Sequence, residues 1–470
     1  MKRNEAPDPG KFAVHFIGIS GIGMSALARI LLQRGDRVSG SSDRPNALTE
    51  RLATEGATIK LGHAAENLDG AGTVVVSTAI DDDNPELRAA RERGLAIVGR
   101  GTFLARLVAE RRGIAVAGTH GKTTTTAMIA TVLEAGGLDP TVVVGGERAD
   151  TNTNARDGAG AWFIAEADES DGSFLDLHPE IAVVTNIEND HVASDAGVAD
   201  LVAAFESFTR NVTPHGLILL GADEPTAAAL AQQRHAARTR TFGLAAGADV
   251  RATRVTYAGF GSRFDVVSQR EVLGELALRV PGAMNVRNAL PAIAIGGELG
   301  VSFATIADAL AAFSGVRRRF EVVATTPRLT VIDDYAHHPT AVAATLKAAR
   351  AGFDGPIVAV FQPHRYSRTA YLAGAFARAL LAADSVVLTD IYAASEAPLP
   401  GVDRATIGAP LAALGADVAY VPDIAELPAH LLAHAPYGAL VLMLGAGSIT
   451  GAAAALAQQL DASPVQSAAR

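Results

Sequence analysis

A phosphate-binding loop is indicated by the sequence A-G-T-H-G-K-T-T-T-T. The apolar run Ile114–Ala117 enters it, and a helix-like run, Thr124–Ala135, leaves it. Free backbone N–H groups and the helix dipole attract anions at such a junction. Lys122 can reach the β and γ oxygens of a nucleotide, and Thr123 has the hydroxyl that such loops place on Mg²⁺. Val116 stands where the usual motif has its first glycine, so an ordinary strand–turn–helix is the alternative.

Acidic side chains follow the next predicted strands. Trp162–Ala165 is followed by E-A-D-E-S-D, in which Glu166 lies nearest the strand end. Ile181–Val184 is followed by T-N-I-E-N-D-H, which places His191 at a second strand end. Parallel sheets bind ligands at these ends, and Mg²⁺ prefers hard oxygen ligands. The pattern predicts a magnesium site; a solvated turn is the alternative, and zinc suits a chain without cysteine less well.

An earlier glycine loop, G-I-S-G-I-G-M-S, follows the predicted strand Val14–Ile17. Ser20 stands where a dinucleotide motif would have its second glycine. Asp43 lies about 20 residues after the loop, where such folds place a ribose carboxylate. From these residues alone, a nicotinamide cofactor and another diphosphate are both open. His63 is either a surface histidine or a ligand contact.

Polar residues also collect at strand ends in the last third of the chain. The predicted strands Leu329–Asp333 and Ile357–Phe361 end in D-D-Y-A-H-H-P and Q-P-H-R-Y-S-R. Arg365 offers a planar fork that suits a carboxylate, whereas the histidines either cap helices or bind a ligand. Upstream, Asn285 and Asn288 lie one helical turn apart and either read a base edge or cap a helix.

The order of these elements predicts an α/β protein of three domains. We expect a Rossmann-like N-terminal domain at 1–110 and a C-terminal Rossmann-like domain at 316–470. Between them we expect a P-loop-type mononucleotide-binding domain at 111–315, with an antiparallel addition at 250–282. The charged segment Glu110–Gly113 and the hinge S-G-V-R-R-R-F-E separate them, and the three arginines of that hinge form either a solvated face or a phosphate clamp.

Composition narrows the class of protein. The chain has 470 residues, a formal charge of −10 and no cysteine. The charge and the lack of a basic tract argue against a nucleic-acid partner, and the lack of cysteine excludes disulfides and thiolate catalysis. No apolar run reaches the roughly 18 residues of a membrane span, and the polar N-terminus is unlike a secretory signal. We therefore expect a cytoplasmic protein with no membrane partner, as a monomer or weak homodimer.

Taken together and in this order, the motifs resemble those of the Mur ligases, the ATP-dependent amide-forming enzymes of peptidoglycan synthesis. The set comprises both glycine-containing loops, E-A-D-E-S-D, T-N-I-E-N-D-H, G-x-x-N-x-x-N, R-R-R-F-E, D-D-Y-A-H-H-P and F-Q-P-H-R-Y-S-R-T. The resemblance covers nearly the whole chain. The first and last motifs are similar to the members that join L-alanine to the lactyl carboxylate of UDP-N-acetylmuramate.

The resemblance implies that the first domain binds the UDP-sugar, the central domain ATP and the last domain the amino acid. It also implies an acyl-phosphate intermediate that domain closure protects from water. It assigns ATP to Gly118, Thr119, His120, Gly121, Lys122, Thr123, Thr124, Asn285, Asn288, Arg319 and Asp334. It assigns the UDP-sugar to Gly18, Ser20, Gly21, Gly23, Ser25, Asp43 and His63. It assigns L-alanine to Tyr335, His364 and Arg365, and Mg²⁺ to Thr123, Glu166 and His191. The catalytic residues are then Lys122, Glu166, His191 and Arg365.

Two positions depart from the family pattern. Met284 stands where the family often has histidine, and Val192–Ser194 follow His191 where an acidic or aromatic residue is usual.

Three other functions stay open. A ligase of the same family that recycles muropeptides would attach a tripeptide instead of L-alanine. A nicotinamide oxidoreductase would leave the Lys122 loop unexplained. A nucleotide-gated sensor that binds a UDP-sugar without turnover would be favoured by loss of Lys122 or Glu166, and both are present.

Overall fold

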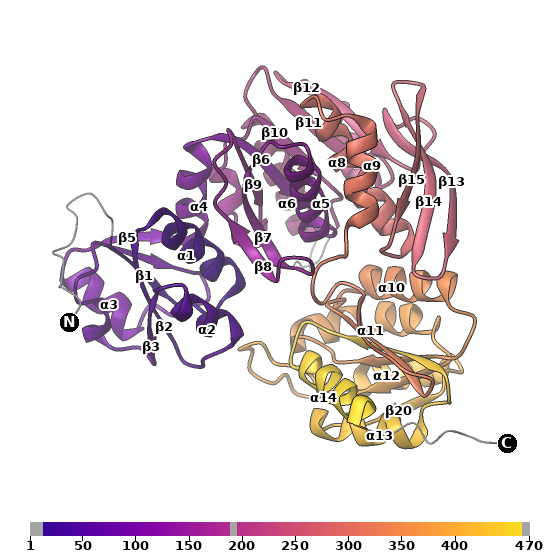
Figure 1. Ribbon diagram of the computed structural model, residues 1–470. Helices are drawn as coiled ribbons and strands as arrows, with labels where there is room; N and C mark the ends of the chain where they lie inside the picture. The colour runs from indigo at the N-terminus through magenta and orange to yellow at the C-terminus, as the bar shows by residue number, and fades with distance from the viewer. Residues whose placement is uncertain (1–12, 189–194, 463–470) are drawn as a thin grey trace. The chain divides into compact units, whose positions relative to one another are not determined.

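The computed structural model describes residues 13–188 and 195–462 (Figure 1). The chain forms two compact units. The first contains the described residues up to Glu188 together with Ala196–Arg251 and Asn288–Ala309. The second contains Ala252–Arg287 and the described residues from Leu310 onward. Strands and helices alternate through most of both units, so the predicted α/β class is confirmed.

The first unit begins with a five-stranded, all-parallel sheet in the order β3-β2-β1-β4-β5. Its strands are β1 (Ala13–Ile17), β2 (Arg37–Ser42), β3 (Thr58–Leu61), β4 (Thr73–Val76) and β5 (Ala96–Gly99). Its helices are α1 (Ile22–Arg34), α2 (Ala47–Thr54), η1 (Ala65–Leu68), α3 (Pro85–Glu92) and α4 (Arg100–Ala109). This order is the Rossmann-like arrangement that the sequence predicted. Strand β3 was not predicted, because it is mostly exposed and lacks the apolar run of a buried strand.

Gly35 ends α1. Its φ of 85° lies in the left-handed region, and its N–H bonds the carbonyls of Leu31 and Leu32. Glycine adopts this conformation without the steric cost that a Cβ would add. The chain then turns directly into β2, which pairs with β1 residue by residue.

A second sheet of the first unit has the order β13-β12-β11-β10-β6-β9-β7-β8. Its first strands are β6 (Arg112–Ala117), β7 (Thr141–Arg148), β8 (Thr153–Arg156) and β9 (Trp162–Glu166). The others are β10 (Ile181–Val184), β11 (Leu217–Gly221), β12 (Arg238–Gly243) and β13 (Val250–Ala258), which continues into the second unit. The accompanying helices are α5 (Lys122–Ala135), η2 (Ser173–Asp176), α6 (Asp195–Arg210) and α7 (Pro225–Leu230). Two more helices, α8 (Gly282–Glu298) and α9 (Phe303–Ala312), have residues in both units.

Three neighbouring strands of this sheet position the predicted nucleotide loop. Strand β6 pairs in parallel with β10 on one side and with β9 on the other. Ile114–Ala117 of β6 and all of β10 are buried, as expected of strands covered on both faces. Since parallel strands end at the same edge of a sheet, the segments after β6, β9 and β10 come together there. The predicted charged linker is shorter than expected, because β6 already begins at Arg112.

The second unit contains a hairpin and a third sheet. Strands β14 (Gly261–Ser268) and β15 (Glu271–Leu278) are antiparallel, which confirms the predicted antiparallel addition. The third sheet has the order β16-β17-β21-β18-β19-β20, and only β16 runs antiparallel to its neighbour. Its strands are β16 (Glu321–Thr325), β17 (Leu329–Asp334), β18 (Ile357–Phe361), β19 (Ser385–Leu388), β20 (Val418–Tyr420) and β21 (Ala439–Leu444). Its helices are α10 (Pro339–Gly352), α11 (Tyr366–Leu380), α12 (Ala405–Ala413), η3 (Ile424–Glu426), α13 (Leu427–His434) and α14 (Ile449–Ala462).

Helix α11 begins at Tyr366, directly after Arg365. Its first turn is polar and is held by side-chain hydrogen bonds. The hydroxyl of Thr369 donates to the carbonyl of Arg365 at 2.8 Å, and that of Ser367 donates to Glu396 at 2.7 Å. Among the described helices, none is long and apolar enough to cross a membrane.

Candidate active site

The predicted nucleotide loop joins the buried strand β6 to helix α5. The helix begins at Lys122, two residues earlier than predicted, and Gly121 precedes it with a φ of 85°. A side chain at Gly121 would collide with the amide of Asn288, so that amide lies directly beside the loop. The N-terminus of a helix attracts anions, and this one follows the loop directly, while its binding of a phosphate stays a prediction.

Lys122 is held by a buried carboxylate. Its ammonium donates to both oxygens of Glu169 at 3.0 and 2.8 Å, and to the carbonyl of Gly118 at 2.6 Å. The Glu169 side chain is only 4% exposed. Its burial raises the pKa of Glu169 above the usual value, although the Lys122 charge opposes the shift. A nucleotide phosphate would compete with Glu169 for this ammonium, a role that the sequence did not assign to Glu169.

Thr123 and Glu166 form a pair of oxygen donors beside the loop. The Thr123 hydroxyl donates to Oε1 of Glu166 at 3.1 Å, and the N–H of Gly145 donates to Oε2 at 2.8 Å. Such a hydroxyl–carboxylate pair fits Mg²⁺, which takes one or two protein oxygens and keeps its other positions for water and phosphate. His191, the third predicted ligand, lies outside the described residues.

The segment after β10 supports the loop from the other side. Asn186 binds His120 through both ends of its amide, accepting from the backbone N–H at 2.8 Å and donating to the carbonyl at 2.9 Å. The hydroxyl of Thr185 also donates to the His120 carbonyl, at 2.6 Å. Glu188 and Thr119 exchange hydrogen bonds of 2.8 and 3.0 Å between backbone and hydroxyl. These bonds fix the loop before any nucleotide is bound.

The first glycine loop begins where β1 ends. The hydroxyl of Ser20 accepts from Ser42 at 2.8 Å. Ser25 is fully buried and its hydroxyl is already engaged, by the amide of Asn154 at 3.0 Å and by a carbonyl of its own helix. Nε2 of His63 lies 3.5 Å from the carboxylate of Asp43, so the structure brings these two predicted residues together. The UDP-sugar contacts of the loop stay predictions.

Arg100 links the first glycine loop with the acidic segment after β9. Its guanidinium lies 2.9 Å from the carboxylate of Asp171 and 3.5 Å from that of Asp168. A side chain at Gly23 would meet the Arg100 side chain at 3.2 Å. Within the first unit, this cation therefore lies between the two predicted anion-binding regions. Sequence reasoning missed Arg100, although its place directly after the parallel strand β5 was a usable signal.

In the second unit, the predicted amino-acid residues lie at the ends of β17 and β18. The Tyr335 ring lies 5.0 Å from that of His337, which lies 5.6 Å from that of His364. Arg318 and Arg319 each place a guanidinium 4.9 Å from the centre of the Tyr335 ring. Tyr335 and His364 therefore belong to one cluster of rings flanked by cations.

Arg365 has an unusual backbone for a residue with a side chain. Its φ is 68°, and its N–H is held by the carbonyl of Tyr392 at 2.9 Å. Such strain persists only where the surroundings impose it, and it is common at binding sites. Burial would raise the pKa of the Glu396 carboxyl, but the hydrogen bonds from Ser367 and, more weakly, the Arg365 charge hold that pKa below its usual value.

Two residues that the resemblance assigned to ATP have structural partners in the second unit. The buried carboxylate of Asp334 accepts the N–H groups of Phe320 at 2.8 Å and Ala336 at 2.7 Å. Burial raises its pKa, and the nearby Arg319 charge opposes the shift. Asn285 donates to the carbonyl of Pro281 at 2.8 Å. Asp334 thus ties the predicted hinge to β17, and the ATP contacts of both residues stay predictions.

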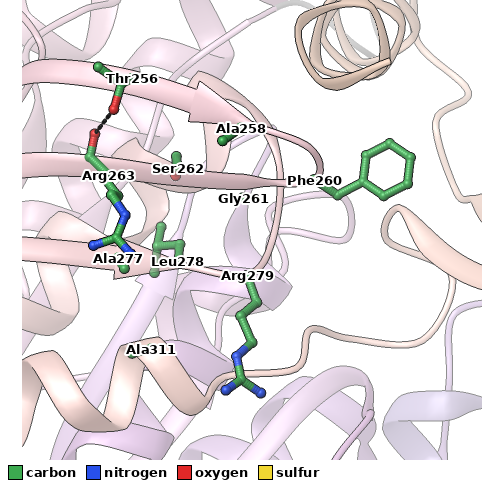
Figure 2. A pocket seen from close by; sticks show the side chains of 10 residues that line it. All are labelled: Thr256, Ala258, Phe260, Gly261, Ser262, Arg263, Ala277, Leu278, Arg279 and Ala311. Atoms are coloured by element: carbon green, nitrogen blue, oxygen red, sulfur yellow. Dashed lines mark hydrogen bonds between the residues drawn. The ribbon is translucent and has the colours of Figure 1, made fainter. Parts of the chain in front are cut away.

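A pocket of about 620 Å³ lies against the hairpin strands of the second unit (Figure 2). Two arginines line it, Arg263 and Arg279, and Arg263 is paired with Glu275 at 3.2 Å. None of the predicted site residues lines this pocket. We therefore give it no part in the chemistry.

Gly145 offers a test of the Glu166 carboxylate. A Cβ at this position would lie 2.5 Å from Oε2 of Glu166 and would push the carboxylate away from Thr123. We expect Gly145→Ala to raise the Mg²⁺ concentration that half-saturates turnover by about 10- to 100-fold, as when a supporting contact of a metal ligand is lost. Because the displaced atom ends a flexible side chain, the unfolding temperature should change little.

The matched control is Gly297→Ala, an exposed helical position with nothing near the added methyl group. It should leave the Mg²⁺ dependence of turnover unchanged. An unchanged Mg²⁺ dependence in Gly145→Ala would contradict the placement of the metal at Glu166.

Comparison with known proteins decides the family. Family models match three consecutive segments of the chain. These are "Mur ligase family, catalytic domain" at residues 13–112, "Mur ligase middle domain" at 116–296 and "Mur ligase, glutamate ligase domain" at 318–447. The chain belongs to the Mur ligase family. Its three-domain α/β fold is therefore the Mur ligase fold, as the motifs predicted, while the boundaries at 110 and 315 stay predictions.

Individual Mur ligases are similar to the chain over almost its full length. The UDP-N-acetylmuramate–L-alanine ligase of Geotalea daltonii is 45% identical over 96% of this chain and 98% of its own. That of Acidithiobacillus ferrooxidans is 47% identical over the same shares. The crystal structure of the Thermotoga maritima UDP-N-acetylmuramate–alanine ligase has a TM-score of 0.82 at 32% identity, covering 96% of this chain and 99% of that one. A murein peptide ligase from Psychrobacter arcticus reaches 0.72 at 25% identity, with the same coverage.

Proposed function

We propose that this chain joins L-alanine to the lactyl carboxylate of UDP-N-acetylmuramate, with ATP as the energy source, in the synthesis of peptidoglycan precursors. The observation that carries the proposal is the Lys122 loop with the Thr123–Glu166 pair beside it, in a chain 45–47% identical over 96% of its length to ligases named for this reaction. The strand-to-helix loop supplies a phosphate site, and the full-length similarity supplies the substrate class.

In the first step, an oxygen of the lactyl carboxylate attacks the γ-phosphorus of ATP. The P–O bond to ADP breaks, and an acyl phosphate forms. Both reactants are anions, so the step needs charge neutralisation more than a protein nucleophile. Lys122 supplies a cation once the phosphate replaces Glu169 as its partner. Bound Mg²⁺, which Thr123, Glu166 and His191 would hold, would neutralise phosphate charge.

In the second step, the neutral amine of L-alanine attacks the acyl carbon, and inorganic phosphate leaves. The Arg365 guanidinium is the proposed partner of the alanine carboxylate, because its planar fork matches two carboxylate oxygens. Tyr335 and His364 lie in the ring cluster of the same unit and are proposed to shape the pocket. A pocket alone distinguishes one methylene by only about 10- to 200-fold, so glycine and serine should be slow substrates.

Attachment of a tripeptide is the second candidate. It is favoured by the fold similarity to the Psychrobacter arcticus murein peptide ligase, but the identity to that protein is only 25%. The two functions differ in the amine, so one assay separates them. Phosphate release is measured with ATP, Mg²⁺ and UDP-N-acetylmuramate, adding L-alanine, glycine, L-serine or the tripeptide in turn. We expect L-alanine to give the highest kcat/KM, and a preference for the tripeptide would favour the recycling function.

We place the enzyme in the cytoplasm, as a monomer or weak homodimer without nucleic-acid or membrane partners. The net charge of −10 and the lack of a basic tract argue against a nucleic-acid partner. Both substrates are small anions or zwitterions. Local loops can bind them, so no extended surface of positive charge is needed.

A further inference from the structure

The first unit contains a buried carboxylate that the proposed reaction does not use. Glu86, the second residue of α3, is fully buried. Its Oε2 accepts from the Ser41 hydroxyl at 2.5 Å and from Nδ1 of His63 at 3.0 Å. Its Oε1 accepts from the Asn67 amide at 2.5 Å. Burying a carboxylate costs much free energy unless hydrogen bonds of this kind replace its hydration. The donors around Glu86 therefore compensate for its burial.

Glu86 is an anion at neutral pH. Burial by itself would raise its pKa, but the nearby His15 ring and the hydrogen bonds from Ser41, Asn67 and His63 lower the pKa to about 2. Nε2 of His15 lies 3.7 Å from Oε1. An ionised carboxylate has no hydrogen to donate, so each neighbour of Glu86 must be the donor.

This requirement fixes the His63 ring. Nδ1 must carry a hydrogen that points at Glu86, and the second nitrogen therefore faces the other way. That nitrogen, Nε2, lies 3.5 Å from Oδ1 of Asp43. The Asp43 side chain is 78% exposed and that of His63 is 14% exposed, so the Asp43 carboxylate is open to solvent beside a mostly buried imidazole.

The cluster is continuous with the first glycine loop. The carbonyl of Ser41 accepts the N–H groups of Gly18 at 3.0 Å and Ile19 at 2.9 Å, while its hydroxyl donates to Glu86. Asp43 directly follows β2, the position from which dinucleotide-binding folds contact a ribose. A nucleotide whose diphosphate lies at the loop would therefore present its ribose near Asp43 and His63.

We propose that Glu86 is a positioning residue of the UDP-sugar site, which holds His63 so that its Nε2 and the Asp43 carboxylate together bind the two vicinal hydroxyls of the ribose. The inference rests on the proposed function, because it requires a uridine nucleotide at the glycine loop. Two polar groups placed for two hydroxyls select against a 2′-deoxyribose, which leaves one of these groups without a hydrogen-bond partner.

The test compares Glu86→Gln with Glu92→Gln, an exposed position at the other end of α3. Binding of UDP and of 2′-deoxy-UDP is measured by calorimetry. We expect the wild-type protein and the control to prefer UDP by about 10-fold, the value of one lost hydrogen bond. Glu86→Gln should weaken UDP by about 10- to 100-fold and bring the ratio close to one. Its KM for UDP-N-acetylmuramate should rise while kcat stays near the wild-type value.

A second measurement needs no stable variant of Glu86. ¹⁵N-histidine spectra of the wild-type protein should show His63 with a hydrogen on Nδ1, its signal identified by its loss in His63→Gln. A ring with hydrogen on Nε2 alone, equal affinity of the wild type for both nucleotides, or an unchanged ratio in Glu86→Gln would overturn the inference. A wild-type protein that bound neither UDP nor UDP-N-acetylmuramate would overturn the proposed function and the inference with it.

Discussion

Replacing Lys122 with methionine should abolish phosphate release while UDP-N-acetylmuramate still binds. The ammonium is the one side-chain cation in the loop itself, and it must neutralise the γ-phosphate as charge is transferred. Loss of a cation that stabilises phosphoryl transfer lowers turnover by about 10³-fold or more. Steady-state phosphate release measures the loss, and calorimetry with the UDP-sugar measures the retained binding.

The control for this variant follows from the ion pair with Glu169. Without Lys122, the buried Glu169 carboxyl has lost its partner, which by itself costs stability. The double variant Lys122→Met with Glu169→Gln removes that unpaired charge and should recover the unfolding temperature without recovering turnover. If the double variant regained activity, the role of Lys122 would be structural and our assignment of the loop would be wrong.

Arg365→Ala should raise the KM for L-alanine by about 100-fold and leave the KM for ATP nearly unchanged. A charged hydrogen bond contributes roughly 1.5–3 kcal/mol, and the guanidinium can make two such bonds with one carboxylate. Arg365→Lys should recover only part of the loss, because an ammonium cannot bind both carboxylate oxygens in one plane. Phosphate release at varied L-alanine measures both effects.

Arg378→Ala provides the matched control, because this arginine lies exposed near the other end of the same helix. It should leave the KM for L-alanine unchanged. Equal effects of the two substitutions would mean that Arg365 acts through the charge of the helix and not through the substrate carboxylate.

The fold could be predicted largely from its buried strands. β6 and β10 are continuous apolar runs covered on both faces, and such runs are visible in a sequence. β3 could not be recognised in the same way, because three of its four residues are exposed. Its place in the sheet is set by pairing with β2 and not by its own pattern.

The candidate site could be predicted only where its residues are neighbours in sequence. The Lys122 loop is one such segment, and its motif was recognisable. The partner of Lys122 was not, because four acidic residues lie at the end of β9 and just after it, and only the folded chain shows that Glu169 is the one that binds Lys122. Glu86 is a stronger case, since its donors come from β2 and from the segment after β3, which no local pattern connects.

The central claim is that the chain activates a sugar carboxylate with ATP and passes it to L-alanine. The most direct measurement is phosphate release with ATP, Mg²⁺ and UDP-N-acetylmuramate, with and without L-alanine, followed by mass spectrometry of the UDP-sugar. We predict release that depends on both substrates and a product heavier by one alanyl residue. Release that is independent of L-alanine, or a UDP-sugar of unchanged mass, would contradict the account.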